Sequence, residues 1–450
     1  MRKVDLLIIY ELKNRELENS ALLAAEMERR GYSTLVLYNY SKPIRMNIEA
    51  KVIITPHLYE DQQLEFYINN KRQSNRNAIS MQYEHISSED DEDGINNPKG
   101  QAQLAQHIAW GQDQVNKYLN HGIEPSHIHK TGCVSMDFFR DEFKSYFLTK
   151  SQIAEKLNID ENKEWVLFVS SFAFSSMEEE EILRNLIRSF GDCDNTREKA
   201  RFTLNSYSQI LNWLKVAAEN YPNKLFIYRK HPKEILSDAV KELESSLPNF
   251  KCISDHSMKQ WAVVSDKIYN WISTSQADIY FAGKSSYILR PIPISHEMDI
   301  SLFTDCEHIT TEEDFIKSID CDDYHSPISA EKIHYYYCNM PEGKMAFENI
   351  ADLCEEMIKN SELGSDYHFE LNKNFLYYIK NLYDLALYYY GKNIRTPEWI
   401  ISSLNKIPFM RTRTAGKLKI LNDDLYKADE QYSVYFNKFR DLLGSIHSNA

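Results

Sequence analysis

The chain has 450 residues, of which 43% are hydrophobic and 26% are charged, and its formal net charge at pH 7 is -14. This length exceeds one ordinary hydrophobic core, so two domains and an extension are expected. The acidic balance argues against a general nucleic-acid binder, which needs a basic face. The seven cysteines include no C-x-x-C pair, and no apolar run is long enough for a signal peptide or a bilayer span, so a cytoplasmic protein with reduced thiols is predicted.

The first part of the chain, residues 1–150, alternates strand and helix patterns. Strands are predicted at 4–10, 33–38, 51–55, 77–83 and 128–130, and helices at 14–30, 61–70, 101–109 and 112–119. This order predicts a doubly wound sheet, in which ligands lie beyond the carboxyl ends of the strands. The residues at these ends are Glu11 with the polar segment after it, Pro56-His57 and Glu84-His85. Glu84 follows one such strand and Asp93 lies in the acidic loop 87–94. Both are candidates for a general base, whereas pairing of Glu84 with Arg15 and a solvated acidic loop are the structural alternatives.

The second part, residues 160–360, begins with the buried-type strand 165–170 and again alternates strands and helices. The strand 224–228 ends in the basic run Arg229-Lys230-His231-Pro232-Lys233. Pro232 biases His231 towards an extended conformation, which would aim its imidazole beyond the strand end. A basic surface turn is the alternative.

Residues 266–290 form the most informative stretch of this part. A strand at 267–272, a helix at 276–282 that stops at Gly283, and a strand at 286–289 make one βαβ unit. The turn before the helix carries Ser273, Thr274 and Ser275, which are expected to cap the helix. Hydroxyls and backbone N–H groups at such a turn favour an anion, so a phosphate site is predicted, although many capped helices hold no ligand.

The last part, residues 361–450, is different. Tyr- and Leu-rich helices at 375–390, 398–404 and 424–443 replace the alternation, which predicts a helical extension. The basic segment 410–419 between them suits contact with anionic lipid, and a solvated loop is the alternative.

Metal and cofactor signals are weak. His127 and His129 form one H-x-H pattern without a neighbouring carboxylate or cysteine that would complete a ligand set. Neither a P-loop nor a G-x-G-x-x-G motif is present. A metal-independent reaction without a bound cofactor is therefore predicted.

Four segments together carry a family resemblance: YELKNRELENSALLAAEMERRGY, WGQDQVNKYLNHGIEPSHIHKTGCVSMD, RKHPKE and ISTSQADIYFAGKSSYILRP. Residues 1 to about 355 resemble bacterial surface carbohydrate biosynthesis proteins, which are similar to GT-B glycosyltransferases and, more distantly, to bacterial sialyl- and Kdo-transferases and CDP-glycerol phosphotransferases. The resemblance implies an α/β, GT-B-like fold of two doubly wound Rossmann-like domains. The domains expected are an acceptor-side domain at 1–150, a nucleotide-donor domain at 160–360 and the helical extension at 361–450.

The resemblance also implies roles for residues. His231, Ser273, Thr274 and Ser275 would hold the donor phosphate, with Arg229 beside them, and Glu84 or Asp93 would be the base. The turn at 132–137 matches a family motif but lacks its Pro and Arg.

The function expected is inverting transfer of a sugar from a nucleotide-activated donor, a CMP-linked acidic sugar, to a glycan or lipid-linked glycan acceptor. This would take place in the cytoplasm or at the inner face of the membrane. The alternatives are a CDP-polyol phosphotransferase, a nucleotide-sugar epimerase, and a non-catalytic scaffold of a polysaccharide assembly complex. The scaffold predicts no change of melting temperature with any nucleotide.

Overall fold

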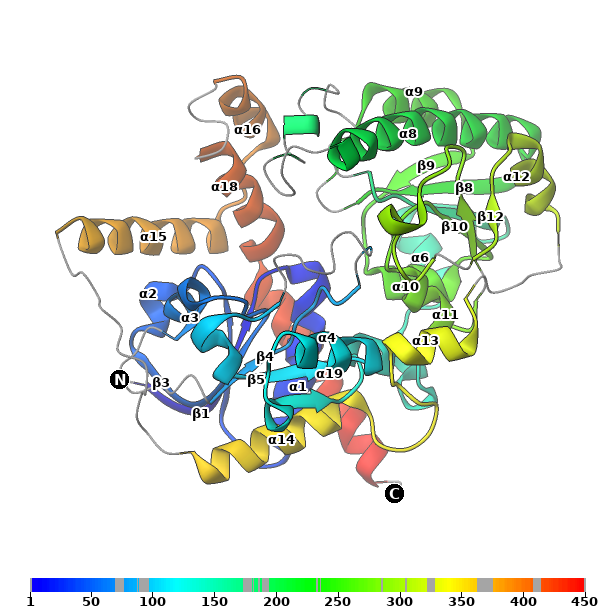
Figure 1. The fold of residues 1–450 in the computed structure, drawn as a ribbon. Coiled ribbons are helices and arrows are strands. Elements are labelled where there is room, and N and C mark those ends of the chain that lie inside the picture. The colour runs from blue at the N-terminus through cyan, green and yellow to red at the C-terminus, as the bar shows by residue number, and fades with distance from the viewer. Residues whose placement is uncertain are drawn as a thin grey trace. The chain divides into compact units, whose positions relative to one another are not determined.

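The computed structural model describes most of the chain, and every statement below concerns those residues. They are 2–68, 77–86, 88, 97–172, 180, 182–184, 187, 194–231, 234, 236–284, 286–303, 306–321, 328–361, 375–407 and 414–448. The chain divides into two compact units (Figure 1). Unit 1 comprises Met1–His85, Ile95–Asp137 and Tyr337–Ala450, and unit 2 comprises Ile86–Gly94 and Phe138–Tyr336.

Unit 1 contains a six-stranded parallel sheet in the order β2-β1-β3-β4-β5-β6. Its strands are β1 Arg2–Tyr10, β2 Thr34–Tyr38, β3 Ile48–Thr55, β4 Ala78–Ser80, β5 Gln106–Ala109 and β6 Ile128–Lys130. Its helices before the chain leaves the unit are η1 Lys13–Leu17, α1 Glu18–Arg29, α2 Lys42–Arg45, α3 Asp61–Tyr67, η4 Gly100–Leu104, α4 Gln112–Asn120, η5 Pro125–His127 and α5 Val134–Asp137. All five residues at positions 6–10 of β1 are buried, as expected for a strand covered on both faces.

Unit 2 contains a second six-stranded parallel sheet, in the order β12-β11-β10-β7-β8-β9. Its strands are β7 Glu164–Val169, β8 Lys224–Arg229, β9 Phe250–Ile253, β10 Lys267–Asn270, β11 Ser286–Leu289 and β12 His308–Ile309. Its helices are η6 Asp141–Tyr146, α6 Lys150–Leu157, α8 Asp194–Asn220, α9 Asp238–Ser246, α10 Met258–Val264, α11 Gln276–Phe281, η7 His296–Met298, α12 Glu312–Ile319 and α13 Ala330–Tyr336.

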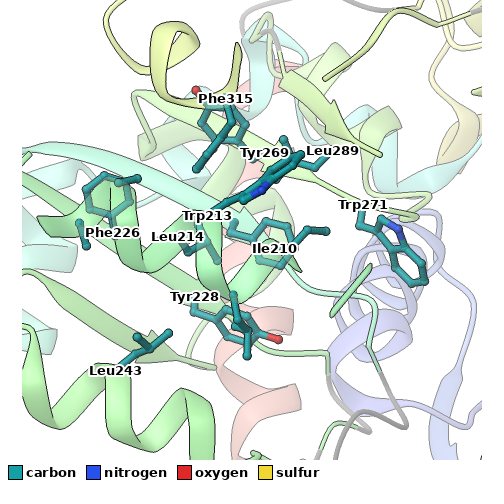
Figure 2. Packing of buried hydrophobic residues seen from close by; sticks show 14 of the residues in the cluster. Ile210, Trp213, Leu214, Phe226, Tyr228, Leu243, Tyr269, Trp271, Leu289 and Phe315 are labelled. Carbon is teal, nitrogen blue, oxygen red and sulfur yellow. The ribbon is translucent and has the colours of Figure 1, made fainter. Parts of the chain in front are cut away.

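The core of unit 2 is aromatic on one face of this sheet. Trp213 of α8 stacks on Phe315 of α12 with ring centroids 6.0 Å apart, and Tyr269 of β10 meets Phe315 edge-on at 4.9 Å (Figure 2). The 27 residues of α8 supply much of the helix side of this cluster. Burial of such large rings dominates the energetics of a core, so this cluster fixes the strand ends that carry the candidate site.

The chain returns to unit 1 through an anchored turn. The side chain of Asn339 accepts a hydrogen bond from Cys133 N at 2.8 Å and donates to Cys133 O and to Asp137 Oδ1, both at 2.9 Å. Asp137 Oδ2 in turn accepts from Phe347 N at 2.9 Å. Gly132 has φ +86°, and a Cβ there would lie 3.0 Å from Asn339 Oδ1. The turn at 132–137 therefore ties the returning chain to unit 1.

The helices after this turn complete unit 1. They are α14 Ala346–Asn360, α15 Phe375–Asn393, α16 Glu398–Asn405, α18 Gly416–Ile420, η9 Leu421–Leu425 and α19 Ala428–Ser448. Both α14 and α19 pack against α1, and Figure 1 shows α19 in red beside α1. Leu421 and Leu425 join Tyr10 and Tyr38 in one buried cluster.

The predicted fold class is confirmed: the protein is α/β and GT-B-like, with two doubly wound sheets and a helical C-terminal extension. The compact units differ from the three predicted ranges 1–150, 160–360 and 361–450, because residues 86–94 belong to unit 2, the main crossing falls at residues 137–138, and residues 337–450 belong to unit 1. The extension is thus a part of the first unit rather than a separate body.

One predicted element was wrong, because the helix at 101–109 is a 3₁₀ turn followed by β5. The predicted strand at 77–83 is present but shorter, as β4. Ala, Gln and Leu favour a helix locally, yet residues 106–109 pair with β4 and β6 on both sides. Pairing within a sheet overrode the local preference, as is common for buried strands.

Candidate functional site

The candidate site of unit 2 lies where its strand order reverses. From β7 the chain proceeds outwards through β8 and β9, and then returns to place β10 on the other side of β7. Open α/β sheets bind ligands at this switch point, beyond the carboxyl ends of the strands. Ser170 and Ser171 follow β7, residues 271–275 follow β10, and Arg229 ends the adjacent β8. Arg229, His231, Ser273, Thr274 and Ser275, which the sequence singled out, therefore share one edge of one sheet.

The hydroxyl-rich loop after β10 has a defined geometry. Ser273 Oγ accepts from Ser275 N at 3.3 Å and Ser273 O accepts from Gln276 N at 3.1 Å. Ser275, the residue before α11, makes no side-chain capping bond, so the expected cap is instead a local turn made by Ser273. Thr274 is exposed, and Ser273 and Ser275 are half-buried. Ile272 N donates to Ser171 Oγ at 3.3 Å, which joins this loop to the one after β7.

Two buried residues, Trp271 and Arg290, support the start of the loop that follows β10. Trp271 stacks on Phe172 with ring centroids 4.2 Å apart, and Arg290 at the end of β11 donates from Nη1 to Trp271 O. Nη2 of Arg290 donates to Asp299 Oδ1 at 2.8 Å, with both side chains buried. This ion pair fixes the backbone directly before Ser273, because it ties a main-chain carbonyl to a rigid side chain.

His231 is positioned by a buried carboxylate, Glu234, which is fully buried. Glu234 Oε2 accepts from His231 N at 2.9 Å and from Ser170 Oγ at 2.6 Å, and its Oε1 accepts from Tyr228 OH at 2.6 Å. Burial raises the pKa of Glu234, while these hydrogen bonds counteract that rise. The carboxylate thus links the ends of β7 and β8. The sequence analysis missed its role, although an acid directly after a basic run was a visible signal.

Arg229 brings positive charge to the same edge. Its Nη2 donates to His256 O at 3.0 Å, while its buried Nε has no hydrogen-bond partner in the described part of the chain. Burial lowers the pKa of Arg229 to about 10, and the nearby carboxylate of Asp278 counteracts this. The guanidinium remains charged at neutral pH and presents an unsatisfied donor, which favours an anionic ligand.

In unit 1, Glu84 follows β4 by four residues and is exposed. Its Oε1 lies 2.9 Å from Arg15 Nη1, and Arg15 Nη2 lies 2.7 Å from Oε1 of the fully buried Glu16. The pairing with Arg15 named above as the structural alternative is therefore present. Arg15 therefore contacts one of the two carboxylate oxygens of Glu84.

A second acid–base pair lies at the switch point of unit 1, between β1 and β3. Glu11 follows β1 and His57 follows β3, and His57 Nδ1 lies 3.4 Å from Glu11 Oε2. His57 stacks on Tyr59 at 5.1 Å, and its Nε2 lies 3.5 Å from Tyr67 OH. Burial lowers the pKa of His57, which keeps the imidazole neutral. The sequence placed Glu11 and His57 at the carboxyl ends of two strands, and the structure brings the two side chains together.

The remaining predicted residues take no part in a described site. Asp93 and the acidic loop around it lie outside the described residues, as do residues 410–413. His129 Nε2 lies 2.7 Å from Gln106 Oε1 and His127 Nδ1 lies 3.3 Å from Gln103 O. Within the described part of the chain, no group of three or more His, Cys, Asp or Glu side chains could hold a metal ion. The metal-independent reaction and the absence of a cofactor stay predictions.

These observations define the class of fold: two Rossmann-like sheets, each with polar groups at its switch point, in a GT-B-like protein. Among the described residues, no helix is both long and apolar enough to cross a membrane. No known family profile matches the chain, and no curated protein matches it.

Solved structures do match the fold. A variant of the wall teichoic acid polymerase TagF is 12% identical, with 79% of this chain and 89% of that chain covered and a TM-score of 0.51. The S. aureus MnaA–UDP complex is 12% identical, with 82% and 100% covered and a TM-score of 0.48. Methanocaldococcus jannaschii UDP-GlcNAc 2-epimerase, bound to UDP-GlcNAc and UDP, is 12% identical, with 74% and 97% covered and a TM-score of 0.47. At these identities the likeness shows the fold alone.

Proposed function

We propose that the protein is a transferase of bacterial surface polysaccharide biosynthesis that uses a nucleotide-activated donor. Unit 2 holds the phosphate of the donor, a CMP-linked acidic sugar, and unit 1 supplies the base. The sugar passes with inversion to a glycan or lipid-linked glycan acceptor, without a metal or a bound cofactor. The reaction takes place in the cytoplasm or at the inner face of the membrane.

One observation supports this proposal: a cation, an imidazole and three hydroxyl side chains follow the carboxyl ends of β8 and β10, the two strands that flank β7 in the unit 2 sheet. Arg229 and His231 come from the end of β8, and Ser273–Ser275 come from the end of β10. Among the described residues, nothing accepts a hydrogen bond from the buried Nε of Arg229. A phosphate oxygen would satisfy such a donor, and charge-assisted hydrogen bonds to phosphate are among the strongest in proteins.

Departure of the nucleotide places negative charge on its phosphate. Prearranged donors that meet this charge as it develops stabilise the transition state more than the ground state. His231 suits this role because Glu234 holds its backbone at the strand end. The hydroxyl of Thr274 is exposed to a ligand at the same edge.

The acceptor hydroxyl needs a base within hydrogen-bond reach. Glu84 and Asp93 are the candidates from sequence. The structure adds the Glu11–His57 pair, in which a carboxylate can orient a neutral imidazole. We favour His57, because it lies with Glu11 at the switch point between β1 and β3, whereas Glu84 follows β4 and is paired with Arg15.

Replacement of His231 by alanine tests the proposal. We expect kcat for transfer to fall about 10²- to 10³-fold, because one donor to the developing charge is lost. The rise in melting temperature caused by CMP or CDP should also shrink. His296→Ala replaces an exposed histidine of η7 and serves as the control. Unchanged transfer and unchanged nucleotide binding in His231→Ala would contradict the proposal.

A second candidate, transfer of a polyol phosphate from a CDP-polyol, is supported by the likeness in fold to a teichoic acid polymerase. Attack on the distal phosphorus would release CMP and form a phosphodiester, whereas attack on the anomeric carbon of a CMP-sugar releases CMP and forms a glycosidic bond. Because both release CMP, ³¹P NMR of the polymeric product distinguishes them.

A further inference from the structure

The outward side of α15 is apolar, which is unusual for a surface helix. Ile379, Leu382, Tyr383 and Tyr389 have exposed fractions of 47%, 67%, 48% and 54%. Their spacing places them on one face of the helix, which we call the α15 face. Trp399 of the following helix α16 is 71% exposed. Such a face normally carries polar residues, so its composition needs a reason.

The opposite side of α15 accounts for its packing within unit 1. Tyr388 is buried and Leu387 is partly buried, in a cluster with Leu421 and Leu425. Helix α15 also packs against α2 and η9, as Figure 1 shows for α2. The core contacts of the helix are therefore made by its inner side and do not require the α15 face.

Exposed apolar side chains are concentrated in this part of the chain. Among the described residues, 13 large hydrophobic side chains are exposed, and eight of them lie between residues 375 and 420. Single exposed hydrophobic residues are ordinary, but a local concentration marks an interaction surface.

The charge of the same segment identifies the partner. Residues 375–420 contain eight Lys and Arg against two Asp and Glu, a net of +6 in a protein whose formal net charge is -14. Lys380, Arg395 and Lys406 are exposed. Aromatic and aliphatic side chains beside basic residues match the interface of an anionic bilayer, where apolar groups enter the acyl boundary and cations meet the headgroups.

We propose that α15 and α16 dock the protein on a membrane surface that contains anionic lipid. The α15 face and Trp399 enter the interface, and Lys380, Arg395 and Lys406 contact the headgroups. Docking by this surface does not depend on the proposed catalytic activity, because neither nucleotide-binding residues nor the base take part in it.

Flotation of the full chain with vesicles tests the proposal. Vesicles of 70% phosphatidylcholine and 30% phosphatidylglycerol should bind the protein at 0.1 M salt, and vesicles of phosphatidylcholine alone should bind it much less. Leu382→Ser with Trp399→Ser should weaken binding about ten-fold or more. Leu119→Ser, at a leucine of α4 that is 43% exposed, is the matched control and should change nothing.

Variants that remove charge separate the contribution of the basic residues to vesicle binding from that of the apolar residues. The triple variant Lys380→Gln, Arg395→Gln and Lys406→Gln should lose about five-fold in affinity per residue on the anionic vesicles, and Lys144→Gln should lose none. Melting temperatures verify that each variant is folded, and the assay contains no nucleotide. Absence of binding to the anionic vesicles, or equal binding by Leu382→Ser/Trp399→Ser, would overturn the proposal. So would a dimer without lipid that this double variant converts to a monomer, since the face would then hold a second copy.

Discussion

The carboxyl ends of the strands carry different chemical groups in the two sheets. At the unit 2 switch point the groups nearest the strand ends include Arg229, His231 and hydroxyls, and the carboxylate that accepts from His231 N, Glu234, is fully buried. At the unit 1 switch point the groups are Glu11, His57 and the Arg15–Glu84 pair, partly open to solvent. Similar topology thus yields one edge suited to an anion and another suited to proton transfer.

The two edges also differ in how they are supported. The unit 2 edge is held by residues of its own strands and loops, such as Glu234 and Arg290. The unit 1 edge is held partly by the end of the chain, because Asp424 of η9 accepts from Lys13 N at 2.9 Å and Lys13 Nζ donates to Tyr426 O at 3.1 Å. The C-terminal extension is therefore a structural part of the acid–base edge.

The largest expected effect tests the contrast between buried and exposed carboxylates. Glu234→Ala should lower the free energy of unfolding by about 2 to 4 kcal/mol, because the Ser170 hydroxyl and the His231 N–H lose their acceptor while Tyr228 OH can still donate to Ser170 Oγ. Glu84→Ala should change it by about 1 kcal/mol or less, as for an exposed ion pair. Denaturant unfolding followed by tryptophan fluorescence measures both. An equal loss of unfolding free energy in the two variants would contradict the proposal that Glu234 supports the ends of β7 and β8.

The next effect concerns the support of the unit 1 edge. Burial raises the pKa of Asp424 to about 7 from its ordinary value of 3.8. Between these values the folded state binds a proton that the unfolded state has released, so stability falls as pH rises from about 4 to about 7. Asp424→Asn removes this loss and should stabilise the protein at pH 8 by about 2 to 4 kcal/mol, with little effect at pH 4.

Thermal unfolding at both pH values measures this difference. Asp441→Asn, at an exposed carboxylate of α19, is the control and should shift stability by no more than about 0.5 kcal/mol at either pH. A stabilisation by Asp424→Asn that is equal at pH 4 and pH 8 would show that ionisation of Asp424 is not its cause.

The smallest expected effect tests which residue is the general base at the carboxyl edge of the unit 1 sheet. His57→Asn should reduce kcat about 10²-fold and leave nucleotide binding intact, because the imidazole acts on the acceptor side. It should also abolish the decline of kcat at acidic pH, since burial sets a pKa below the ordinary histidine value. Glu84→Gln should reduce kcat far less. The reverse order would assign the base to Glu84, as the sequence suggested.

Much of the fold was predictable from local pattern. The βαβ unit at residues 266–290 was predicted almost residue by residue, since β10, α11 and β11 fall within it and Gly283 takes φ +67° at the helix end. The elements of residues 101–109 were wrong, because that segment favours a helix locally and becomes a strand only through its neighbours. The grouping of Arg229, His231 and Ser273–Ser275 was also predictable, since parallel strands end at one edge.

The sequence alone determined where most strands end, for example β1 at Tyr10 and β3 at Thr55, since hydrophobic runs and turn residues act within a few positions of the chain. Tertiary structure alone decided that Glu234 lies beneath His231, that Glu11 meets His57, and that Asp424 reaches Lys13 across 411 positions. Such contacts depend on the order of strands in a sheet and on the path of the returning chain. Neither is encoded in local periodicity, because packing between distant segments selects them.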